Sequence, residues 1–280
     1  MAVLYQATFR IPAADEVSFS DSLLESGAES VSIAPANSGR EVYVHAIVDD
    51  IGTLGDKIPE AISVVRLEED VWRNRWLQHY EGHEVNDDIY VYPVTASAPL
   101  SKDYRYVLRL DPRDAFGDGR HPTTTLCLTL LYELLSPLTK KERREKHLLD
   151  IGTGTGILAL CASLMDIGDI HAIDCDETSI AMTRTNAAYN SVRNITVSVS
   201  DIGGFAPGKT YDIITANLLT GILQEHLEKI LSLLEGEGTL IISGISTRWE
   251  KEMDTLLRKK KIPVQKKEIR DEWVAYVLRP

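Results

Sequence analysis

The sequence predicts an α/β fold in two parts, a mostly parallel sheet in the C-terminal half and a small α+β domain before it. From Leu148 onward, apolar strand segments alternate with helical segments, the order that builds a parallel sheet with helices on both faces. A strand, a glycine turn and a helix in succession make this half Rossmann-like. The expected strands are HLLDIG, DIHAID, ITVSVSD, YDIITAN and GTLIISGI.

The C-terminal tail departs from this alternation. The segment PVQKKEIRDEWVAYVLRP predicts two strands joined by a short turn near residues 270–272. Strands joined by so short a turn pair antiparallel. We therefore expect a terminal antiparallel hairpin to close one edge of the sheet.

Residues 1–68 follow the order β-α-β-β-α-β. The strands are VLYQATFRI, AESVSIA, REVYVHAIV and SVVRLEE, and the helices lie in DEVSFSDSLLESG and near IGTLGDKIPEAI. This order is typical of a ferredoxin-like domain, in which helices cover one face of an antiparallel sheet. The segment holds no cluster of catalytic side chains, so we expect a recognition domain. A purely structural lid is the alternative.

Residues 69–102 are predicted to form a linker helix and a junction. Trp72, Trp76 and Tyr80 are spaced i, i+4, i+8, which places three aromatic rings on one helical stripe. Such a stripe more often packs against a neighbour than binds a ligand. Two strands are expected in NDDIYVYPVTASAPLSKDYRYVLRLDP, and the cofactor-binding domain is expected over residues 103–280.

Composition limits the class of protein. A length of 280 residues favours two domains, because a single core stops growing near about 250–300 residues. No apolar run reaches the roughly 18 residues of a membrane helix, and the first residues do not resemble a secretion signal. The three cysteines, Cys127, Cys161 and Cys175, lack metal-ligand spacing and lie among apolar residues. We expect buried thiols, a cytoplasmic protein and no metal or membrane site.

The net charge of −12 bears on the choice of partner. A nucleic-acid surface needs a basic patch to neutralise phosphates, so direct nucleic-acid binding is not expected. An acidic protein suits a basic protein partner. The alternative is that the acidity serves solubility alone.

A glycine turn follows the first strand of the parallel sheet, in LLDIGTGTGILALCASL. Ligands of parallel sheets bind beyond the carboxyl ends of the strands, and Gly152, Gly154 and Gly156 permit positive φ and close backbone approach. A dinucleotide site has the pattern G-x-G-x-x-G, but Ile157 stands where its third glycine would be. The spacing G-x-G-x-G therefore favours S-adenosylmethionine over a dinucleotide.

Asp174 ends the next strand, 22 residues after Gly152. A carboxylate at this place accepts hydrogen bonds from both ribose hydroxyls of an adenosyl cofactor. Asp176 is a weaker candidate, because it lies past the strand and is placed to cap a helix that begins near Glu177.

A second motif lies well before the glycine turn. Residues 115–131, AFGDGRHPTTTLCLTLL, resemble the segment A-F-G-T-G-x-H-P-T-T-x-L-C-L of the PrmA family, methyltransferases that modify large-subunit ribosomal protein eleven. ITANLLTGILQEHLEKI and GTLIISGI also resemble that family. The similarity runs from about residue 105 to 280. Over residues 1–68 it rests mainly on element order, and the Trp-rich junction is also similar.

The resemblance implies a seven-stranded class I methyltransferase sheet with S-adenosylmethionine as cofactor. It implies N-methylation of lysine or α-amino groups on a basic ribosomal protein that docks against residues 1–68. Three alternatives stay open: a methyltransferase for another protein or a small molecule, a dehydrogenase, and a non-catalytic cofactor-binding or scaffold protein.

The resemblance also places Thr124, Gly152, Asp174 and Asn217 in the cofactor site. Thr124 follows His121 and a proline at a predicted helix start, where its hydroxyl could meet the methionine carboxylate. It could equally be an ordinary first-turn threonine. Phe116 and Gly117 are expected to shape the pocket mouth. His121 is interpreted as structural, with a general-base role as the alternative.

Asn217 ends the strand YDIITAN and is the candidate catalytic residue, because its amide oxygen could orient the substrate amine. The alternative is a simple helix N-cap. Asp201, at the end of the third strand, is expected to reach the adenine edge.

The sequence departs from the family pattern at Gly236-Glu237-Gly238, which lacks the usual proline before the fifth strand, and at two further places. Thr153 and Thr155 stand where the family commonly has cysteine and serine, and Asp118 and Arg120 replace family threonines. The first change is mild for a loop that works through its backbone. The second changes side chains in the part of the 115–131 segment that is expected to contact the cofactor or the substrate.

Overall fold

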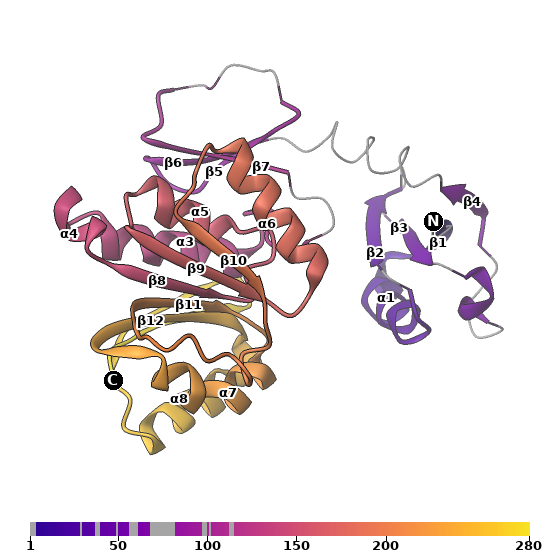
Figure 1. Ribbon diagram of the computed structural model, residues 1–280. Coiled ribbons are helices and arrows are strands. Elements are labelled where there is room, and N and C mark those ends of the chain that lie inside the picture. The colour runs from indigo at the N-terminus through magenta and orange to yellow at the C-terminus, as the bar shows by residue number, and fades with distance from the viewer. Residues whose placement is uncertain are drawn as a thin grey trace. The chain divides into compact units, whose positions relative to one another are not determined.

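The computed structural model describes residues 4–28, 30–36, 40–48, 50–55, 61–67, 82–96, 100, 102–111 and 115–280. The chain divides into two compact units, Met1–His79 and Tyr80–Pro280. Figure 1 labels the elements of both units. The predicted aromatic stripe of Trp72, Trp76 and Tyr80 lies outside the described residues.

The N-terminal unit is built on a four-stranded antiparallel sheet with the order β2-β3-β1-β4. Its elements are β1 (Leu4–Pro12), η1 (Ala13–Asp15), α1 (Glu16–Glu25), β2 (Ser30–Pro35), β3 (Glu41–Val48), η2 (Ile51–Leu54) and β4 (Ser63–Leu67). The four predicted strands and the first helix are confirmed. Within the predicted second helix the described part is the short 3-10 helix η2, and residues 56–60 lie outside the described set.

Alternating residues of the two central strands form the core of this unit. Phe9 of β1 and Val44 of β3 are buried on the face that α1 covers. Phe9 meets Phe19 of α1 edge to face, with ring centroids 5.2 Å apart. The period of two along the strands therefore directs one apolar face onto the helix.

A three-stranded sheet begins the second unit, in the order β5-β6-β7. It consists of β5 (His83–Glu84), β6 (Ile89–Pro93) and β7 (Tyr106–Leu110), with β6 and β7 parallel. The two strands predicted here are confirmed as β6 and β7. Asn186, a buried residue later in the same unit, fixes the end of β7. Its amide oxygen accepts from Asp111 N, and its Nδ2 donates to Asp111 O.

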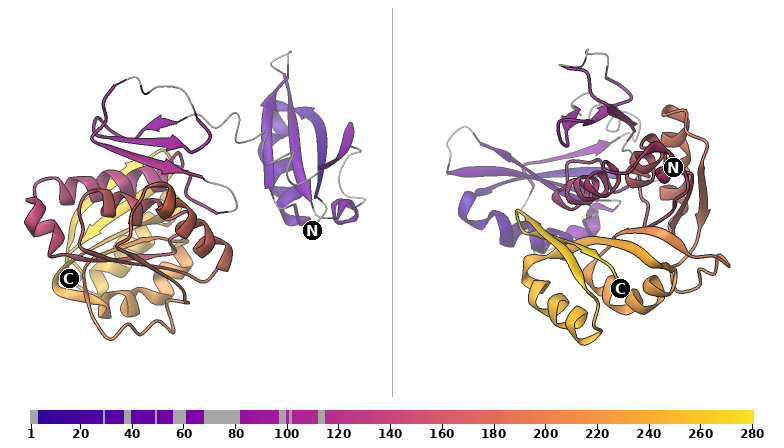
Figure 2. Two further views of the ribbon diagram at one scale, coloured as in Figure 1. Left: turned by 45° about the horizontal axis from the view of Figure 1, so that its top comes forward. Right: turned by 90° about the vertical axis from the view of Figure 1, so that its left-hand side faces the viewer.

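The main sheet has seven strands in the order β10-β9-β8-β11-β12-β14-β13. They are β8 (His147–Ile151), β9 (Asp169–Asp174), β10 (Ile195–Val199), β11 (Tyr211–Asn217), β12 (Leu234–Ser246), β13 (Val264–Arg270) and β14 (Trp273–Leu278). The first five run parallel, while β14 pairs antiparallel with both β12 and β13. The predicted parallel strands and the edge hairpin are confirmed, and Figure 2 shows that hairpin in yellow.

Helices cover both faces of this sheet (Figures 1 and 2). They are α3 (Pro122–Leu135), α4 (Lys140–Arg144), α5 (Ile157–Leu164), α6 (Glu177–Tyr189), α7 (Thr220–Ser232), η3 (Thr247–Trp249) and α8 (Glu250–Lys259). Leu148 packs into a core with α3 and α5, whereas the next residue, Leu149, packs into a core with α7 and α8. A strand buried on both sides reads as a continuous apolar run, which is why HLLDIG showed no alternation.

The order of the strands reverses beside β8. From β8 the chain continues outward through β9 to β10, and then returns to place β11 on the other side of β8. In open α/β sheets this switch point is where ligands bind, at the carboxyl ends of the strands. No helix in the described part of the chain is long and apolar enough to cross a membrane.

Candidate functional site

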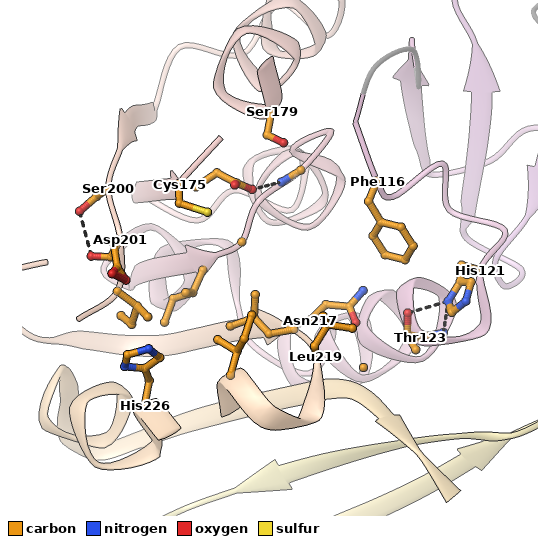
Figure 3. Close-up of a pocket in the computed structure, with 18 of the residues that line it drawn as sticks. Phe116, His121, Thr123, Cys175, Ser179, Ser200, Asp201, Asn217, Leu219 and His226 are labelled. Atoms are coloured by element: carbon orange, nitrogen blue, oxygen red, sulfur yellow. Dashed lines mark hydrogen bonds between the residues drawn. The ribbon is translucent and has the colours of Figure 1, made fainter. Parts of the chain in front are cut away.

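A cavity of about 640 Å³ lies at the switch point, entirely within the second unit (Figure 3). Ligand sites typically have volumes of about 300–1,000 Å³. Apolar atoms form most of the lining surface, although many of the lining residues have polar side chains. The lining comprises Phe116, His121, Thr123, Ile151, Gly152, Gly154, Asp174, Cys175, Ser179, Ser200, Asp201, Ile202, Asn217, Leu218, Leu219, Ile222, His226, Gly244 and Trp273.

The glycine loop, residues 152–156, connects β8 to α5 and carries three glycines at positive φ. A Cβ on Gly154 would lie 2.3 Å from the Phe116 carbonyl oxygen, and a Cβ on Gly152 would lie 2.3 Å from the Leu218 side chain. Both glycines line the cavity, so their lack of a side chain leaves backbone facing the ligand space. Gly156 lies outside the lining and is the N-cap of α5, packed against Thr183.

A second loop, which we call the signature loop (residues 115–121), is fastened to the glycine loop by Thr155. The backbone N–H of Thr155 donates to Phe116 O at 3.0 Å, and its hydroxyl donates to Gly117 O at 2.6 Å. Thr155 replaces a family serine without losing this hydroxyl donor. Gly117 is not among the lining residues and shapes the site through this bond.

Asp118, the most evident departure from the family pattern, stabilises the signature loop locally. Its Oδ1 accepts the backbone N–H of Arg120 at 3.0 Å, a short turn around Gly119, whose φ is +88°. Aspartate suits such turns because its carboxylate hydrogen-bonds the backbone two residues on. The replacement therefore preserves an ordered loop.

Asp174 ends β9 and faces the cavity. Its Oδ2 accepts from Gly154 N and its Oδ1 accepts from Asp176 N, each at 3.0 Å. The carboxylate is thus oriented by backbone, and its remaining lone pairs are available to a ligand. Asp176 caps α6 by accepting from Thr178 N and Ser179 N, as predicted, and does not line the cavity.

Asp150 is a buried carboxylate that the sequence analysis missed. It lies in β8 directly before the glycine loop and accepts hydrogen bonds from Thr153 Oγ1 (2.7 Å) and Thr215 Oγ1 (2.6 Å). Burial raises the pKa of Asp150 to about 6, and the two hydroxyl donors oppose that rise. Thr153, in place of a family cysteine, therefore anchors the loop. An acid within an apolar strand was the available signal.

Asn217 ends β11 and lines the cavity, but it is not the cap of the following helix. Helix α7 begins at Thr220 and has Leu219 as its N-cap, so the N-cap interpretation of Asn217 is wrong. Asn217 Nδ2 donates to Thr124 Oγ1 at 3.5 Å, a long hydrogen bond. With Nδ2 used in this way, Oδ1 is the acceptor that the side chain offers a ligand.

The start of α3 brings a different residue to the cavity than the one predicted. Thr124 is buried in the first turn and does not line the cavity, whereas Thr123 and His121 do. His121 is the N-cap of α3, and its Nδ1 accepts from Thr123 N. Its ring lies between those of Phe116 and Trp273, with centroids 5.3 and 5.0 Å away, and burial lowers its pKa. The capping bond favours the structural interpretation of His121.

Asp201 lines the cavity together with Ser200 and Ile202. Figure 3 shows Asp201 and Ser200 on the side of the cavity opposite Phe116. Strand β10 ends at Val199, two residues earlier than the predicted strand. Asp201 is held in the turn after it, because its Oδ1 accepts from Gly203 N at 2.9 Å. The predicted position beyond the third parallel strand is therefore observed, in the loop rather than in the strand.

The prediction that all three cysteines are buried is wrong for Cys175. Cys127 and Cys161 are buried, whereas Cys175 is exposed and lines the cavity. It follows the last residue of β9, where the strand leaves the core. Its position directly after Asp174 was the signal. Trp273 and His226 reach the cavity from β14 and α7, and no local pattern identified them.

Comparison with known proteins supports the resemblance drawn from the motifs. The family model described as "Ribosomal protein L11 methyltransferase (PrmA)" matches residues 41–280. A ribosomal protein L11 methyltransferase of Carboxydothermus hydrogenoformans is 31% identical over 247 residues, which cover 87% of this chain and 77% of that protein. One from Thermoanaerobacter sp. is 31% identical over 204 residues. That alignment covers 73% of this chain but spans only 61% of the length of the relative.

A solved structure shows the same fold. The ribosomal protein L11 methylase of Lactobacillus delbrueckii subsp. bulgaricus superposes with a TM-score of 0.64 at 24% identity. The match covers 71% of this chain and 98% of that one. With the seven-stranded sheet, the switch-point cavity and a family match over most of its length, the chain belongs to the PrmA family of ribosomal protein L11 methyltransferases.

Proposed function

We propose that this chain is an S-adenosylmethionine-dependent protein N-methyltransferase that acts on lysine or α-amino groups of ribosomal protein L11. The observation that carries the proposal is the cavity in which the glycine loop, Asp174 and Asn217 come together. The relatives are named as methyltransferases of that ribosomal protein, in agreement with this site.

The residues present fit the cofactor. Asp174 is oriented by two backbone N–H groups and keeps lone pairs for the ribose hydroxyls. Gly152 and Gly154 leave room for close approach along the loop. Asp201, at the far side, would meet the adenine edge. These contacts account for an adenosyl group without requiring the third glycine of a dinucleotide site.

The remaining predicted residues position the lining of the cavity or shape its mouth. Thr124 supports Asn217 through the hydroxyl that accepts from Asn217 Nδ2, and the first turn of α3 would hold the methionine carboxylate. Phe116 covers the mouth. Gly117 allows the two loops to pack, whereas Gly156 allows the start of α5 to pack against Thr183, and neither glycine lines the cavity.

Bound S-adenosylmethionine supplies an electrophilic methyl group. The chain has to position a neutral amine in a site with little water. A lysine with a pKa near about 10.4 is neutral in roughly one molecule in 2,500 at pH 7, and an α-amine near about 7.8 in roughly a tenth. Burial lowers an amine pKa, so a largely apolar cavity favours the reactive form. Asn217 Oδ1 would accept the amine N–H and orient its lone pair.

The N-terminal unit would recognise the substrate. Its strand order and antiparallel pairing agree with a ferredoxin-like domain over residues 1–68. A linker over residues 69–102 would join it to the methyltransferase domain, residues 103–280. The net charge of −12 suits a basic ribosomal protein in the cytoplasm and not a nucleic acid.

The proposal is tested by incubating the protein with labelled S-adenosylmethionine and ribosomal proteins, followed by mass spectrometry of labelled species. Label on lysine or the α-amine of L11 is the expected result. Label on another protein or on none would overturn the substrate assignment.

Asp174→Ala tests the cofactor site directly. Loss of two charge-assisted hydrogen bonds to the ribose should weaken S-adenosylmethionine binding about 100-fold in calorimetry. Asp176→Ala is the matched control, because Asp176 caps α6 outside the cavity and its loss should leave affinity within about twofold. Equal affinities for all three proteins, or tighter binding of NAD, would contradict the site.

A further inference from the structure

Three large apolar side chains are exposed around the mouth of the cavity. Phe116 is 58% exposed, Leu219 is 70% exposed and Ile222 is 39% exposed, and all three line the cavity. We call these three residues the rim. A cluster of exposed apolar side chains at one opening marks a place where a partner or ligand covers them.

Leu219 occupies a position where leucine is unfavourable. It is the N-cap of α7 and makes no capping hydrogen bond. Serine, threonine, aspartate and asparagine are strongly preferred there, because their side chains accept from the first free N–H groups. The N-terminus of α7 therefore lacks a side-chain cap, and the leucine at that position is mostly exposed to solvent. A binding partner that contacts Leu219 would explain why an exposed leucine stands at the N-cap.

Phe116 is exposed on a backbone that is firmly held. Its carbonyl accepts from Thr155 N at 3.0 Å, and its ring packs against His121 with centroids 5.3 Å apart. The phenyl group is thus fixed at the mouth and does not have to be ordered when a partner arrives. Preorganised apolar groups of this kind bind with a small entropic cost.

The rim side of the cavity carries no carboxylate among the lining residues described. The two acids in the lining are Asp174, which ends β9, and Asp201, which follows β10, and Figure 3 shows Asp201 on the side opposite Phe116. Burial lowers the pKa of His121 and so favours the neutral ring, while the nearby carboxylate of Asp118 opposes that shift. The rim is therefore suited to aliphatic carbon and not to a charged ammonium group.

We propose that the rim is the docking surface for the polypeptide substrate, where it holds the aliphatic carbon next to the target nitrogen. The methylene stem of a lysine, or an apolar side chain beside an α-amine, would pack between Phe116 and Leu219. Recognition at the cavity is then apolar, and burial of the stem helps to desolvate the amine. This inference rests on the proposed methyltransferase function.

Leu219→Ser separates this role from a structural one, because serine supplies the missing cap and removes the rim contact. We expect Tm to rise by roughly 2–4 °C. We expect KM for ribosomal protein L11 to rise about tenfold with little change in kcat, since the lost contact is made in substrate and transition state alike. A variant that is more stable yet binds substrate less well cannot be explained by misfolding.

Two further variants serve as controls. Leu219→Met keeps an apolar contact without adding a cap, so its KM and Tm should stay near those of the wild-type protein. Ile269→Ser removes an apolar side chain that is 51% exposed on β13 and does not line the cavity, and it should leave KM unchanged.

The outcomes separate the two proposals. If the wild-type protein transfers no methyl group to L11, the proposed function fails before any variant is compared, and the docking proposal falls with it. If the wild-type protein is active and Leu219→Ser has an unchanged KM, only the docking proposal is overturned. An equal loss of S-adenosylmethionine affinity in Leu219→Ser would also overturn it, by assigning Leu219 to the cofactor.

Discussion

The glycine loop and the signature loop meet at the same cavity but are held in place by different means. The glycine loop is bounded by regular elements that adjoin it in sequence, β8 before it and α5 after it, and Gly152 N also donates to Ile173 O of β9. The signature loop depends on remote groups, above all on Thr155, whose hydroxyl reaches Gly117. A strand, turn and helix can be predicted locally, whereas a loop fastened by distant residues cannot.

The sharpest test of the comparison is Gly154→Ala, because Gly154 is where the two loops touch. An alanine would combine a φ of +54° with a Cβ 2.3 Å from Phe116 O. Strain and overpacking should together lower the free energy of unfolding by roughly 3–4 kcal/mol, measured by urea denaturation. Binding of S-adenosylmethionine should be lost with it.

Gly208→Ala is the matched control for this substitution. Gly208 has a φ of +68°, but a Cβ there would meet nothing within 4 Å. Only the conformational cost of about 1–2 kcal/mol is expected. If both alanines proved equally costly, the contact between the two loops would not matter to stability.

A second test concerns the anchor beneath the glycine loop. The folded-state pKa of Asp150 is about 6, above the ordinary value of 3.8, so the folded protein holds this proton more tightly than the unfolded chain does. The stability it contributes is complete below about pH 4 and is lost as the pH rises to about 6. Asparagine does not ionise, so Asp150→Asn should not lose stability in this way as the pH rises. Its free energy of unfolding relative to wild type should rise by about 2–3 kcal/mol between pH 4 and pH 7.

Asp176→Asn provides a control of opposite sign. Hydrogen bonds from Thr178 N and Ser179 N hold the pKa of Asp176 below its usual value. Its contribution is therefore present at neutral pH and lost as the pH falls, and it is small because the group is exposed. Unfolding curves at several pH values measure both differences. If the difference in free energy of unfolding between Asp150→Asn and the wild-type protein did not change with pH, burial would not be raising the pKa of Asp150.

The part of the site that the sequence predicted lies at strand ends. Gly152, Asp174 and Asn217 each stand at or directly after the last residue of a strand with a clear apolar pattern, and parallel strands place their carboxyl ends together. Cys175 was assigned to the core together with the apolar strand before it, but it lies between Asp174 and Asp176, where that strand has already ended. At the end of a strand, a side chain one residue further along the chain can be exposed where the strand itself is buried.

The rest of the site arises from tertiary structure. Trp273 reaches the cavity because β14 inserts between β12 and β13, an order that periodicity does not reveal. Thr123 was passed over for Thr124 because the helical turn decides which threonine faces the cavity. The N-cap interpretation of Asn217 failed because helix α7 starts two residues later than the capping pattern would require.

The smallest expected effect comes from Thr155, which links the two loops by its hydroxyl. Thr155→Val keeps the shape of the side chain and leaves Gly117 O without its buried donor, at a cost of about 1–2 kcal/mol. Because Phe116 and Gly117 belong to the signature loop, S-adenosylmethionine affinity should also fall, by about five- to tenfold in calorimetry. Thr155→Ser keeps the donor and loses only a methyl group, so it should destabilise the fold by about 1 kcal/mol and leave affinity within about twofold. If valine and serine weakened binding equally, packing and not the hydroxyl bond would hold the signature loop, and the distinction between the loops would be lost.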